Sequence, residues 1–324
     1  MSCSIIFSKR IDKGACLELL DYLICPISRE PLHREADALV SASGRHRYPV
    51  SPSGIPQFAA QPSSADSRRQ QKHYDRVAAS YLENLSYPHT EEYFRYLDEA
   101  LLKVIGNHSL GDGAEICCGR GEALRLLGSR LRRSIGVDIS LAMLESAQRD
   151  LHRADLLFVQ GDAIMLPLQS DRFDHVFILG GIHHVNDRAA LFHEIFRVLK
   201  PGGRFIYREP VSDFFLWRWL RAIIYRISPA LDADTERPLR HAETVPVLEQ
   251  AGFRSSVWQT FGFLGGAILL NSDVLIFNRA FRFLPGIRAL TRIMARFDDW
   301  MVSLPPLRHA GLQVIGLAEK PAAG

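Results

Sequence analysis

The strongest constraint on the fold is an alternation of short apolar runs and helical patterns that begins near residue 113. Strands are predicted for the runs AEICC, SIGVDI, DLLFVQGD, FDHVFILGG and GRFIYREP. Helical spacing characterises GEALRLLGSRL, DRAALFHEIFRVLK and SLAMLESAQRDL, for which Ser140 suits the N-cap. Apolar strands that alternate with helices predict an α/β fold with a doubly wound, mostly parallel sheet covered on both faces.

The first of these strands ends in a glycine-rich turn, AEICCGRGEAL, in which Cys117 occupies the first loop position. Such a turn brings backbone N–H groups to a helix N-terminus, where an anionic group is stabilised. Asp138 ends the next strand, 17 residues after Gly121, and an acidic residue there can hydrogen-bond ribose hydroxyls. Two other interpretations stay open here: an ordinary turn, and a nicotinamide dinucleotide site, which would need a third glycine that GRGEAL lacks.

Several motifs follow the turn in a fixed order: Asp138 in IGVDIS, Asp162 in QGDAIMLPL, then FDHVFILGGIHHV and RVLKPGGRF. Together with Glu115, Gly119 and Gly121, they resemble the class I S-adenosylmethionine-dependent methyltransferases over roughly residues 70–260. The resemblance implies a Rossmann-like, seven-stranded, mostly parallel sheet and an enzyme that uses S-adenosyl-L-methionine and releases S-adenosyl-L-homocysteine. The segments FRSSVWQTFGF and GLQVIGLAEK are expected to supply the last strands, with a helical insertion before the final one.

The resemblance also implies which residues contact the cofactor. Glu115 stands beside the loop for the methionine end, Asp138 at the ribose, and Leu179 and Gly180 near the sulfonium. The full set of cofactor-binding residues is Tyr74, Tyr81, Glu115, Cys117, Gly119, Gly121, Asp138, Ile139, Met143, Asp162, Ala163, Leu179 and Gly180. Within it, Ile139, Met143, Asp162 and Ala163 surround the adenine, and Tyr74 and Tyr81 belong to a helix that closes over the cofactor.

Cys117 stands where the family commonly has glycine, and it is small enough to cost little if its φ is negative. We therefore expect a working cofactor loop. A degenerate loop with weakened affinity is the alternative. A redox or nucleophilic role shared with Cys118 is disfavoured, because adjacent residues of a strand point to opposite faces.

Three residues near the ends of the later strands are candidates for catalysis: His183, His184 and Glu209. A histidine there could orient the acceptor or take its proton, and related small-molecule methyltransferases carry a similar pair. The alternative is that one histidine packs in the core and the other caps the turn that follows. No metal site is expected, because two adjacent histidines do not form a helical ligand pair.

Residues 1–62 are predicted to form a small β-rich module, separate from a methyltransferase domain over residues 63–324. The pieces around Cys25-Pro26 and Tyr48-Pro49-Val50 resemble small zinc-ribbon-like proteins that activate methyltransferases of RNA and translation factors. The paired cysteines of such proteins are absent, since the C-x-x-C position reads CPIS, which leaves Cys25, His33 and His46 as the nearby candidate ligands. We expect a metal-free module packed on the catalytic domain.

Two segments, at about 211–230 and 264–308, combine arginines with Trp, Phe, Leu and Ile at helical spacing. Basic amphipathic helices of this kind lie in membrane interfaces or cover an apolar ligand. The third possibility is that their apolar sides pack against the sheet. We interpret both segments as elements that cap the substrate.

Composition narrows the remaining choices. The net charge of +3 gives no general case for nucleic-acid binding, and five irregularly spaced cysteines favour a reducing compartment. No apolar run suits a secretory signal or a spanning helix, so we expect a cytoplasmic enzyme with possible peripheral membrane contact. The expected acceptor is a small or lipid-like molecule: a secondary metabolite, a quinone or an envelope-lipid precursor. The alternatives are an RNA or protein methyltransferase, a non-catalytic scaffold, and other S-adenosylmethionine chemistry.

Overall fold

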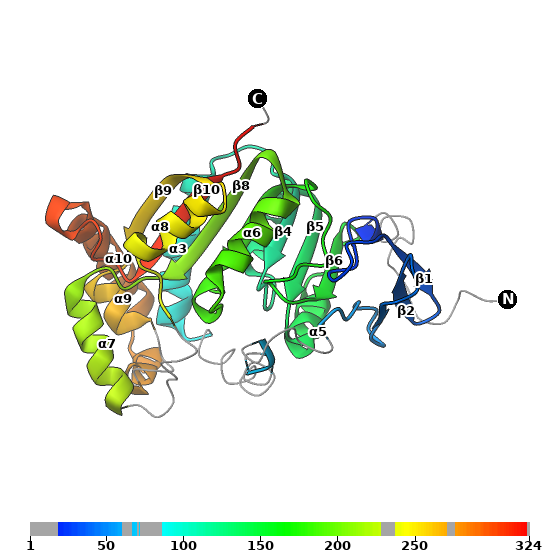
Figure 1. Cartoon of the computed structure of the whole chain (residues 1–324). Helices are drawn as coiled ribbons and strands as arrows, with labels where there is room; N and C mark the ends of the chain where they lie inside the picture. Colours follow the sequence, from blue (N-terminus) through cyan, green and yellow to red (C-terminus); the bar gives the residue numbers. More distant parts are fainter. Residues whose placement is uncertain are drawn as a thin grey trace.

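A seven-stranded sheet forms the centre of the molecule (Figure 1). The computed structural model describes residues 19–59, 67–69, 71, 86–227, 237–270 and 276–322. The strands are β4 (Gly111–Ile116), β5 (Leu131–Asp138), β6 (Leu156–Gln160), β7 (Phe173–Leu179), β8 (Leu199–Pro210), β9 (Arg254–Phe261) and β10 (Gln313–Glu319). They follow the order β6-β5-β4-β7-β8-β10-β9, and β10 runs antiparallel to both its neighbours. The predicted Rossmann-like, mostly parallel sheet is confirmed.

Helices cover both faces of this sheet. One face carries α3 (Pro88–Ile105), α4 (Glu122–Leu127) and α5 (Leu141–Asp150), and the other carries α6 (Arg188–Val198) and α8 (His241–Gln250). The side chains of β7 alternate between the two cores, with Val176 and Ile178 in one and Phe177 and Leu179 in the other. Ser140 caps α5 as predicted, because its Oγ accepts the Met143 N–H at 3.4 Å.

The order of the strands reverses at the middle of the sheet. From β4 the chain moves outward through β5 to β6, and it then returns to place β7 and β8 on the other side of β4. In open sheets of this kind, the carboxyl ends of the two strands at the reversal flank a ligand crevice. The loops after β4 and β7 are therefore expected to flank a ligand-binding site.

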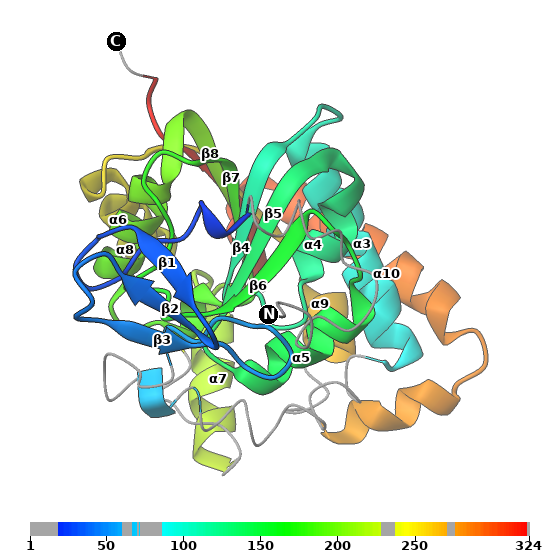
Figure 2. The same cartoon turned by 90° about the vertical axis from the view of Figure 1, so that its right-hand side faces the viewer.

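The N-terminal part of the chain lies against the β6 edge of the sheet (Figure 2). It contains an antiparallel sheet of β1 (Leu32–Glu35), β2 (Ala38–Ser41) and β3 (Arg47–Pro49). Gln160 of β6 donates its N–H to the Pro56 carbonyl at 2.9 Å and accepts the Phe58 N–H at 2.8 Å. These bonds extend the sheet past β6 and cover an edge that would otherwise expose unpaired backbone groups.

The cysteine of the N-terminal sheet region is engaged by neighbouring side chains and backbone. Cys25 is buried, its Sγ lies 3.1 Å from the Tyr48 hydroxyl, and it accepts the Ser28 N–H at 3.3 Å. Among the described residues, no group of three His, Cys, Asp or Glu side chains is placed to hold a metal ion. Ser28 stands where a C-x-x-C pair would have its second cysteine, and its backbone N–H donates to the first cysteine, Cys25.

An insertion of helices separates β9 from β10. It comprises α9 (Leu264–Leu269), η3 (Ile276–Phe283), α10 (Ile287–Ser303) and η4 (Pro305–Leu307), and α7 (Phe215–Ile227) lies beside it (Figure 1). Although the insertion is long, Phe261 and Gln313 at its two ends pair directly across the β9–β10 ladder. None of the helices in the described ranges has both the length and the apolar character needed to cross a bilayer.

A buried carboxylate fixes this insertion to the rest of the fold. Asp298 of α10 is fully buried and accepts the Tyr93 hydroxyl of α3 at 2.5 Å. It also accepts the N–H groups of Gly265 and Gly266, at 2.9 and 2.8 Å, which begin α9. One side chain thus joins three helices, and the predicted helical insertion before the last strand is confirmed.

Candidate active site

The loop after β4 bends sharply between the strand and α4. Three of its five residues have positive φ: Cys117 at 53°, Gly119 at 50° and Gly121 at 75°. The sequence expectation for Cys117 assumed a negative φ, and that assumption is wrong. A non-glycine residue in this left-handed region is strained by about 1–2 kcal/mol, so the cysteine occupies a position whose geometry suits glycine.

Glu115 bonds to the backbone at the start of α4, directly after this loop. Its side chain is buried at the end of β4, and its two carboxylate oxygens accept the N–H groups of Ala123 and Leu124 at 2.9 and 3.1 Å. Burial raises the pKa of Glu115 to about 8, while the two N–H donors at the start of α4 oppose that rise. Its role in the structure is to hold α4 against the strand.

Asp138, at the end of β5, connects two loops. Its Oδ2 accepts the Gly119 N–H at 2.8 Å, and its Oδ1 accepts the Ser140 N–H at 2.9 Å. Each carboxylate oxygen has two lone pairs and can accept more than one hydrogen bond. A Cβ at Gly119 would lie 3.5 Å from the Met143 methyl group, which brings α5 to the same loop.

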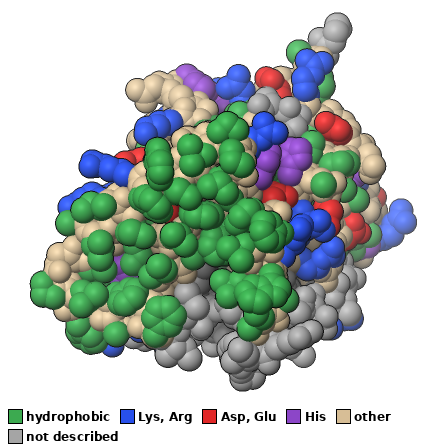
Figure 3. Space-filling view, turned by 90° about the vertical axis from the view of Figure 1, so that its left-hand side faces the viewer, with side chains coloured by type: hydrophobic (Ala, Val, Ile, Leu, Met, Phe, Trp, Pro, Cys, Tyr) green, Lys and Arg blue, Asp and Glu red, His purple; other side chains and the backbone are tan. Residues whose placement is uncertain are grey.

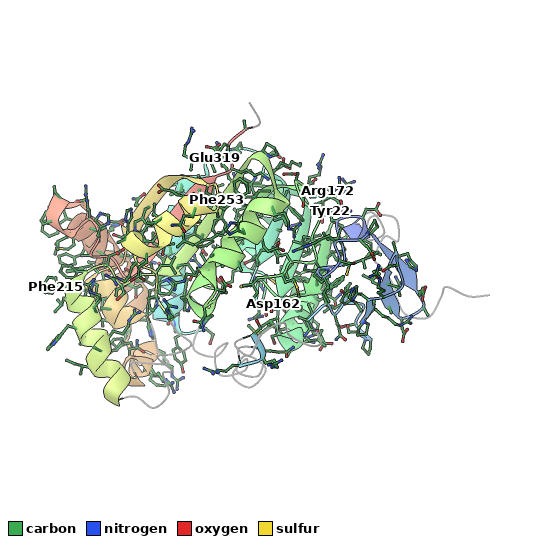
Figure 4. The ribbon with its side chains drawn as sticks, in the orientation of Figure 1. Tyr22, Asp162, Arg172, Phe215, Phe253 and Glu319 are labelled. Carbon is green, nitrogen blue, oxygen red and sulfur yellow. The ribbon has the colours of Figure 1, made fainter. Side chains whose placement is uncertain are left out.

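The loop after β6 carries Asp162 and Ala163 at the same edge (Figure 4). Asp162 is mostly buried, and its Oδ1 accepts the Ile164 N–H at 3.2 Å. The Gly161 N–H donates to the backbone carbonyl of Asp138 at 2.9 Å, which holds the β5 and β6 ends together. Ile139 follows Asp138 and accepts a bond from the Gln160 amide at 3.0 Å.

The loop after β7 offers open backbone. Leu179 ends the strand, and Gly180 follows with a φ of 81°. A Cβ built at Gly180 would meet no atom within 4 Å, so a ligand could approach its backbone closely. Eleven of the thirteen predicted cofactor residues thus lie at one edge of the sheet, on the ends of its strands, on the loops that follow them or, for Met143, on the first turn of α5. Tyr74 and Tyr81 fall outside the described residues.

Glu209, which is buried, and His183, which is half-buried, form a pair at this edge. Glu209 is the penultimate residue of β8, and its Oε1 accepts the N–H groups of Gly181 and Ile182 at 2.6 and 2.8 Å. Its Oε2 lies 2.8 Å from the Nδ1 of His183, whose ring is 3.8 Å from the ring of His184. Because an ionised carboxylate only accepts, Nδ1 donates this bond, and in the neutral form of the ring the Nε2 of His183 carries the lone pair.

Cys117 and Cys118 point to different sides of β4. A Cβ on Gly181, in the loop after β7, would meet the Cys117 Cβ at 2.4 Å. A Cβ on Gly136 of β5 would lie 3.1 Å from the Cys118 Sγ. Burial, assisted by the charge of Asp138, raises the pKa of both thiols, which disfavours a thiolate nucleophile or a shared redox site.

Two residues of this edge were missed from the sequence. Gly181 leaves room for Cys117, and its signal was the second glycine of GGIHH. Arg208 is buried beside Glu209 and pairs with Asp98 of α3 and with Glu122, the first residue of α4. A lone arginine inside the apolar strand FIYREP was its signal. Arg208 thus joins α3 and the start of α4, which follows the glycine loop, to β8.

A cavity of about 890 Å³ lies elsewhere, between α3, β9 and α10. Its lining includes Tyr96, Gln259 and Arg296, and no residue predicted for the cofactor or for catalysis is part of it. The candidate site at the carboxyl edge and this cavity are therefore separate features.

Comparisons with known proteins all find similarity to methyltransferases. A family model described as a methyltransferase domain matches residues 114–207. The chain is 28% identical over 215 residues to a demethylmenaquinone methyltransferase of Lactiplantibacillus plantarum, covering 59% of this chain and 90% of that protein. It is 30% identical over 158 residues to a 2-phytyl-1,4-naphtoquinone methyltransferase of Thermosynechococcus vestitus, covering 43% and 70%.

Solved structures share the fold. The crystal structure of the [4+2]-cyclase SpnF matches with a TM-score of 0.54 at 18% identity, over 79% of this chain and 97% of that chain. At this identity the match speaks for the architecture alone.

Proposed function

Because the chain belongs to the class I S-adenosylmethionine-dependent methyltransferases, we propose that its acceptor is a quinone-type small molecule with an apolar side chain. The observation that carries the proposal is the Glu209–His183 pair, held at the same edge of the sheet as the glycine loop. The acceptor class is supported by two relatives named for naphthoquinone-type substrates. The alignment with the demethylmenaquinone methyltransferase covers 90% of that relative's length.

We assign the cofactor to the loops after β4, β5, β6 and β7. Asp138 would accept hydrogen bonds from the ribose hydroxyls, and Gly119 and Gly121 would let the backbone approach the methionine end. Ile139, Met143, Asp162 and Ala163 would contact the adenine, with Leu179 and Gly180 near the sulfonium. The open space beside the Gly180 backbone suits a ligand of this kind.

The catalytic step then depends on a proton. S-adenosylmethionine supplies an electrophilic methyl group when bound, and the unmethylated ring carbon of a reduced quinone is a stronger nucleophile once the neighbouring hydroxyl has lost its proton. After methyl transfer, that carbon would release its hydrogen as a proton, which restores the aromatic ring. The Nε2 of His183 would take the hydroxyl proton, and the Glu209 carboxylate would stabilise the charged ring through Nδ1. Because backbone N–H groups fix both Glu209 oxygens, the ring is already oriented before the acceptor arrives. His184 would help to position the acceptor.

We also propose a division into an N-terminal module, residues 1–62, and the catalytic domain, residues 63–324. The separate three-stranded sheet supports this division, and the segment that follows it bonds to Gln160 of β6 through Pro56 and Phe58. In this arrangement the module has a structural role, since it covers the sheet edge next to the loop that carries Asp162.

The acceptor assignment is tested by transfer of a labelled methyl group. We expect the purified chain to move tritium from methyl-labelled S-adenosylmethionine to a reduced demethylnaphthoquinone with a short isoprenoid chain. The matched control is the same quinol already methylated at that position, which should stay at background. Labelling of total RNA or protein, with none of the quinol, would contradict the proposal.

Cofactor binding is tested at Asp138. We expect calorimetric titration to give micromolar binding of S-adenosylmethionine, about −8 kcal/mol, and Asp138→Ala to weaken it about 100-fold. The carboxylate bonds the cofactor and also holds the Gly119 and Ser140 N–H groups, and bonds to charged groups contribute about 1.5–3 kcal/mol each. The control is Asp37→Ala, an exposed aspartate of the N-terminal module. Equal affinities in both variants would exclude Asp138 from the site.

A further inference from the structure

The exposed apolar side chains gather at one end of the molecule. Among the described side chains, thirteen large hydrophobic ones are exposed, and twelve lie on α7, α9, η3, α10 and the turn before α10. Figure 3 shows them as a broad hydrophobic surface on the side opposite the N-terminal sheet. We call this surface the apolar face and define it by its six most exposed members, Phe215, Trp219, Phe277, Phe283, Ile293 and Trp300. A contiguous exposed surface of this kind marks an interaction site.

The face is built by helices that are anchored on their other side. On α10, one row of residues is buried against the fold, including Thr291, Ala295 and Asp298. A second row, with Ile293 and Trp300, points outward at helical spacing. Because Asp298 fixes α10 to α3 and α9, the outward row is held in place rather than free to turn inward.

The same arrangement holds for α7. Trp217 is buried, and its indole N–H donates to the Ala310 carbonyl at 2.6 Å, which fixes the rotation of the helix. Phe215 and Trp219 then face outward, 66% and 63% exposed, and Figure 4 places Phe215 at the outer side of the helix. Two aromatic side chains so exposed on an anchored helix are costly to leave in water.

The charge of these segments is strongly one-sided. Residues 214–227, 263–270 and 276–303 contain eight arginines and two aspartates, a net charge of +6 against +3 for the entire chain. Both aspartates are engaged: Asp298 is buried, and Asp299 accepts the Tyr96 hydroxyl. The exposed arginines Arg218, Arg282 and Arg296 each neighbour an aromatic residue in the sequence, whereas Arg288 and Arg292 pair with glutamates of α3.

We propose that the apolar face docks this protein on the surface of an anionic lipid bilayer. Exposed Trp and Phe beside Arg, on helices that lie flat against the fold, match an interface in which rings enter the headgroup region and guanidinium groups meet phosphates. A second copy of the chain fits poorly, because a symmetric contact would bring Arg218, Arg282 and Arg296 of each copy onto an equally basic surface. This docking requires no particular acceptor, and it stands apart from the proposed function.

The test is a vesicle sedimentation assay with the full chain. Vesicles of phosphatidylcholine, with and without about a third of phosphatidylglycerol, are mixed with wild type, with Trp219→Glu/Ile293→Glu, and with Ile27→Glu. Ile27 is the one other large hydrophobic side chain that is exposed among those described, and it lies in the N-terminal module. All three sites are exposed, so circular dichroism and S-adenosylmethionine binding should match the wild type.

We expect wild type and Ile27→Glu to sediment with the anionic vesicles at low salt, and the double variant to bind at least 10-fold more weakly. Binding should also fall as the salt concentration rises. The proposal is overturned if wild type ignores anionic vesicles, or if Ile27→Glu loses binding as strongly as the double variant. It is equally overturned if light scattering reveals a dimer that the double variant dissociates while wild type stays off vesicles.

Discussion

His183→Asn should lower kcat for methyl transfer about 1,000-fold, within the range of roughly 10²–10⁴ expected for a lost general base. Asparagine is polar and of similar size, so the loop after β7 should keep its shape while the proton acceptor disappears. The affinity for S-adenosylmethionine should change little, because the ring contacts Glu209 rather than the residues assigned to the cofactor. Single-turnover rates and a calorimetric titration separate the two effects.

Two further variants sharpen this test. Glu209→Gln should reduce kcat by a similar factor, because the amide NH₂ turned toward His183 would favour the tautomer with its proton on Nε2. His193→Asn changes an exposed histidine of α6 and should leave the rate unaltered. If His183→Asn retains more than a tenth of the wild-type rate, the acceptor needs no base at this position.

Gly181→Ala should lower the free energy of unfolding by about 2–3 kcal/mol, as overpacking of a tight contact does. The added Cβ would lie 2.4 Å from the Cβ of Cys117, and neither loop backbone is free to retreat. The Gly181 N–H donates to the Glu209 carboxylate. Next to Cys117, the Cys118 N–H donates to the Val137 carbonyl at 3.0 Å. Cofactor affinity should fall as well, because the loops after β4 and β7 move apart.

A second substitution should reverse this loss. Cys117→Gly removes the Cβ with which the new alanine would clash. Alone, this substitution should change the free energy of unfolding by less than about 1 kcal/mol. Relief of the strain at φ 53° offsets the lost packing and the added freedom of the unfolded chain. The double variant should therefore be about 2 kcal/mol more stable than Gly181→Ala in urea unfolding, a coupling that a double-mutant cycle measures directly.

Gly180→Ala is the control for this cycle. Its Cβ would meet nothing within 4 Å, so only the strain of φ 81° remains, about 1–2 kcal/mol. Cys117→Gly should not relieve that strain. A double variant of Gly181 and Cys117 that is no more stable than Gly181→Ala would show that the two loops are not in contact.

Local patterns in the sequence were sufficient for much of the sheet. Continuous apolar strands, the glycine turn and Ser140 each act over a few residues, and the structure has the strands and the cap where these signals stand. The reversal that brings β7 beside β4 followed from the family resemblance. The conformation of Cys117 did not follow from either, because φ depends on how the loop fits Gly181 more than 60 residues later.

Long-range polar contacts were also beyond the sequence. Arg208 reads as a charge in a strand, and its burial between Asp98 and Glu122 requires three elements to meet. Asp298 reads as half of an exposed acidic pair, yet it is the buried acceptor for Tyr93 and two backbone N–H groups. The arginine-aromatic pattern predicted amphipathic helices, but which of their sides would be left outward depended on these contacts.

The pairing of Phe261 with Gln313 makes residues 262–312 an exchangeable part. The chain leaves β9 and returns to β10 at adjacent points, so the length and composition of the excursion do not alter the strand register. An excursion whose ends already meet adds little closure entropy as it lengthens, since each doubling costs only about 0.6 kcal/mol. Evolution or design can therefore replace this insertion, and with it the surface presented outward, while the sheet and the loops at its carboxyl edge stay unchanged.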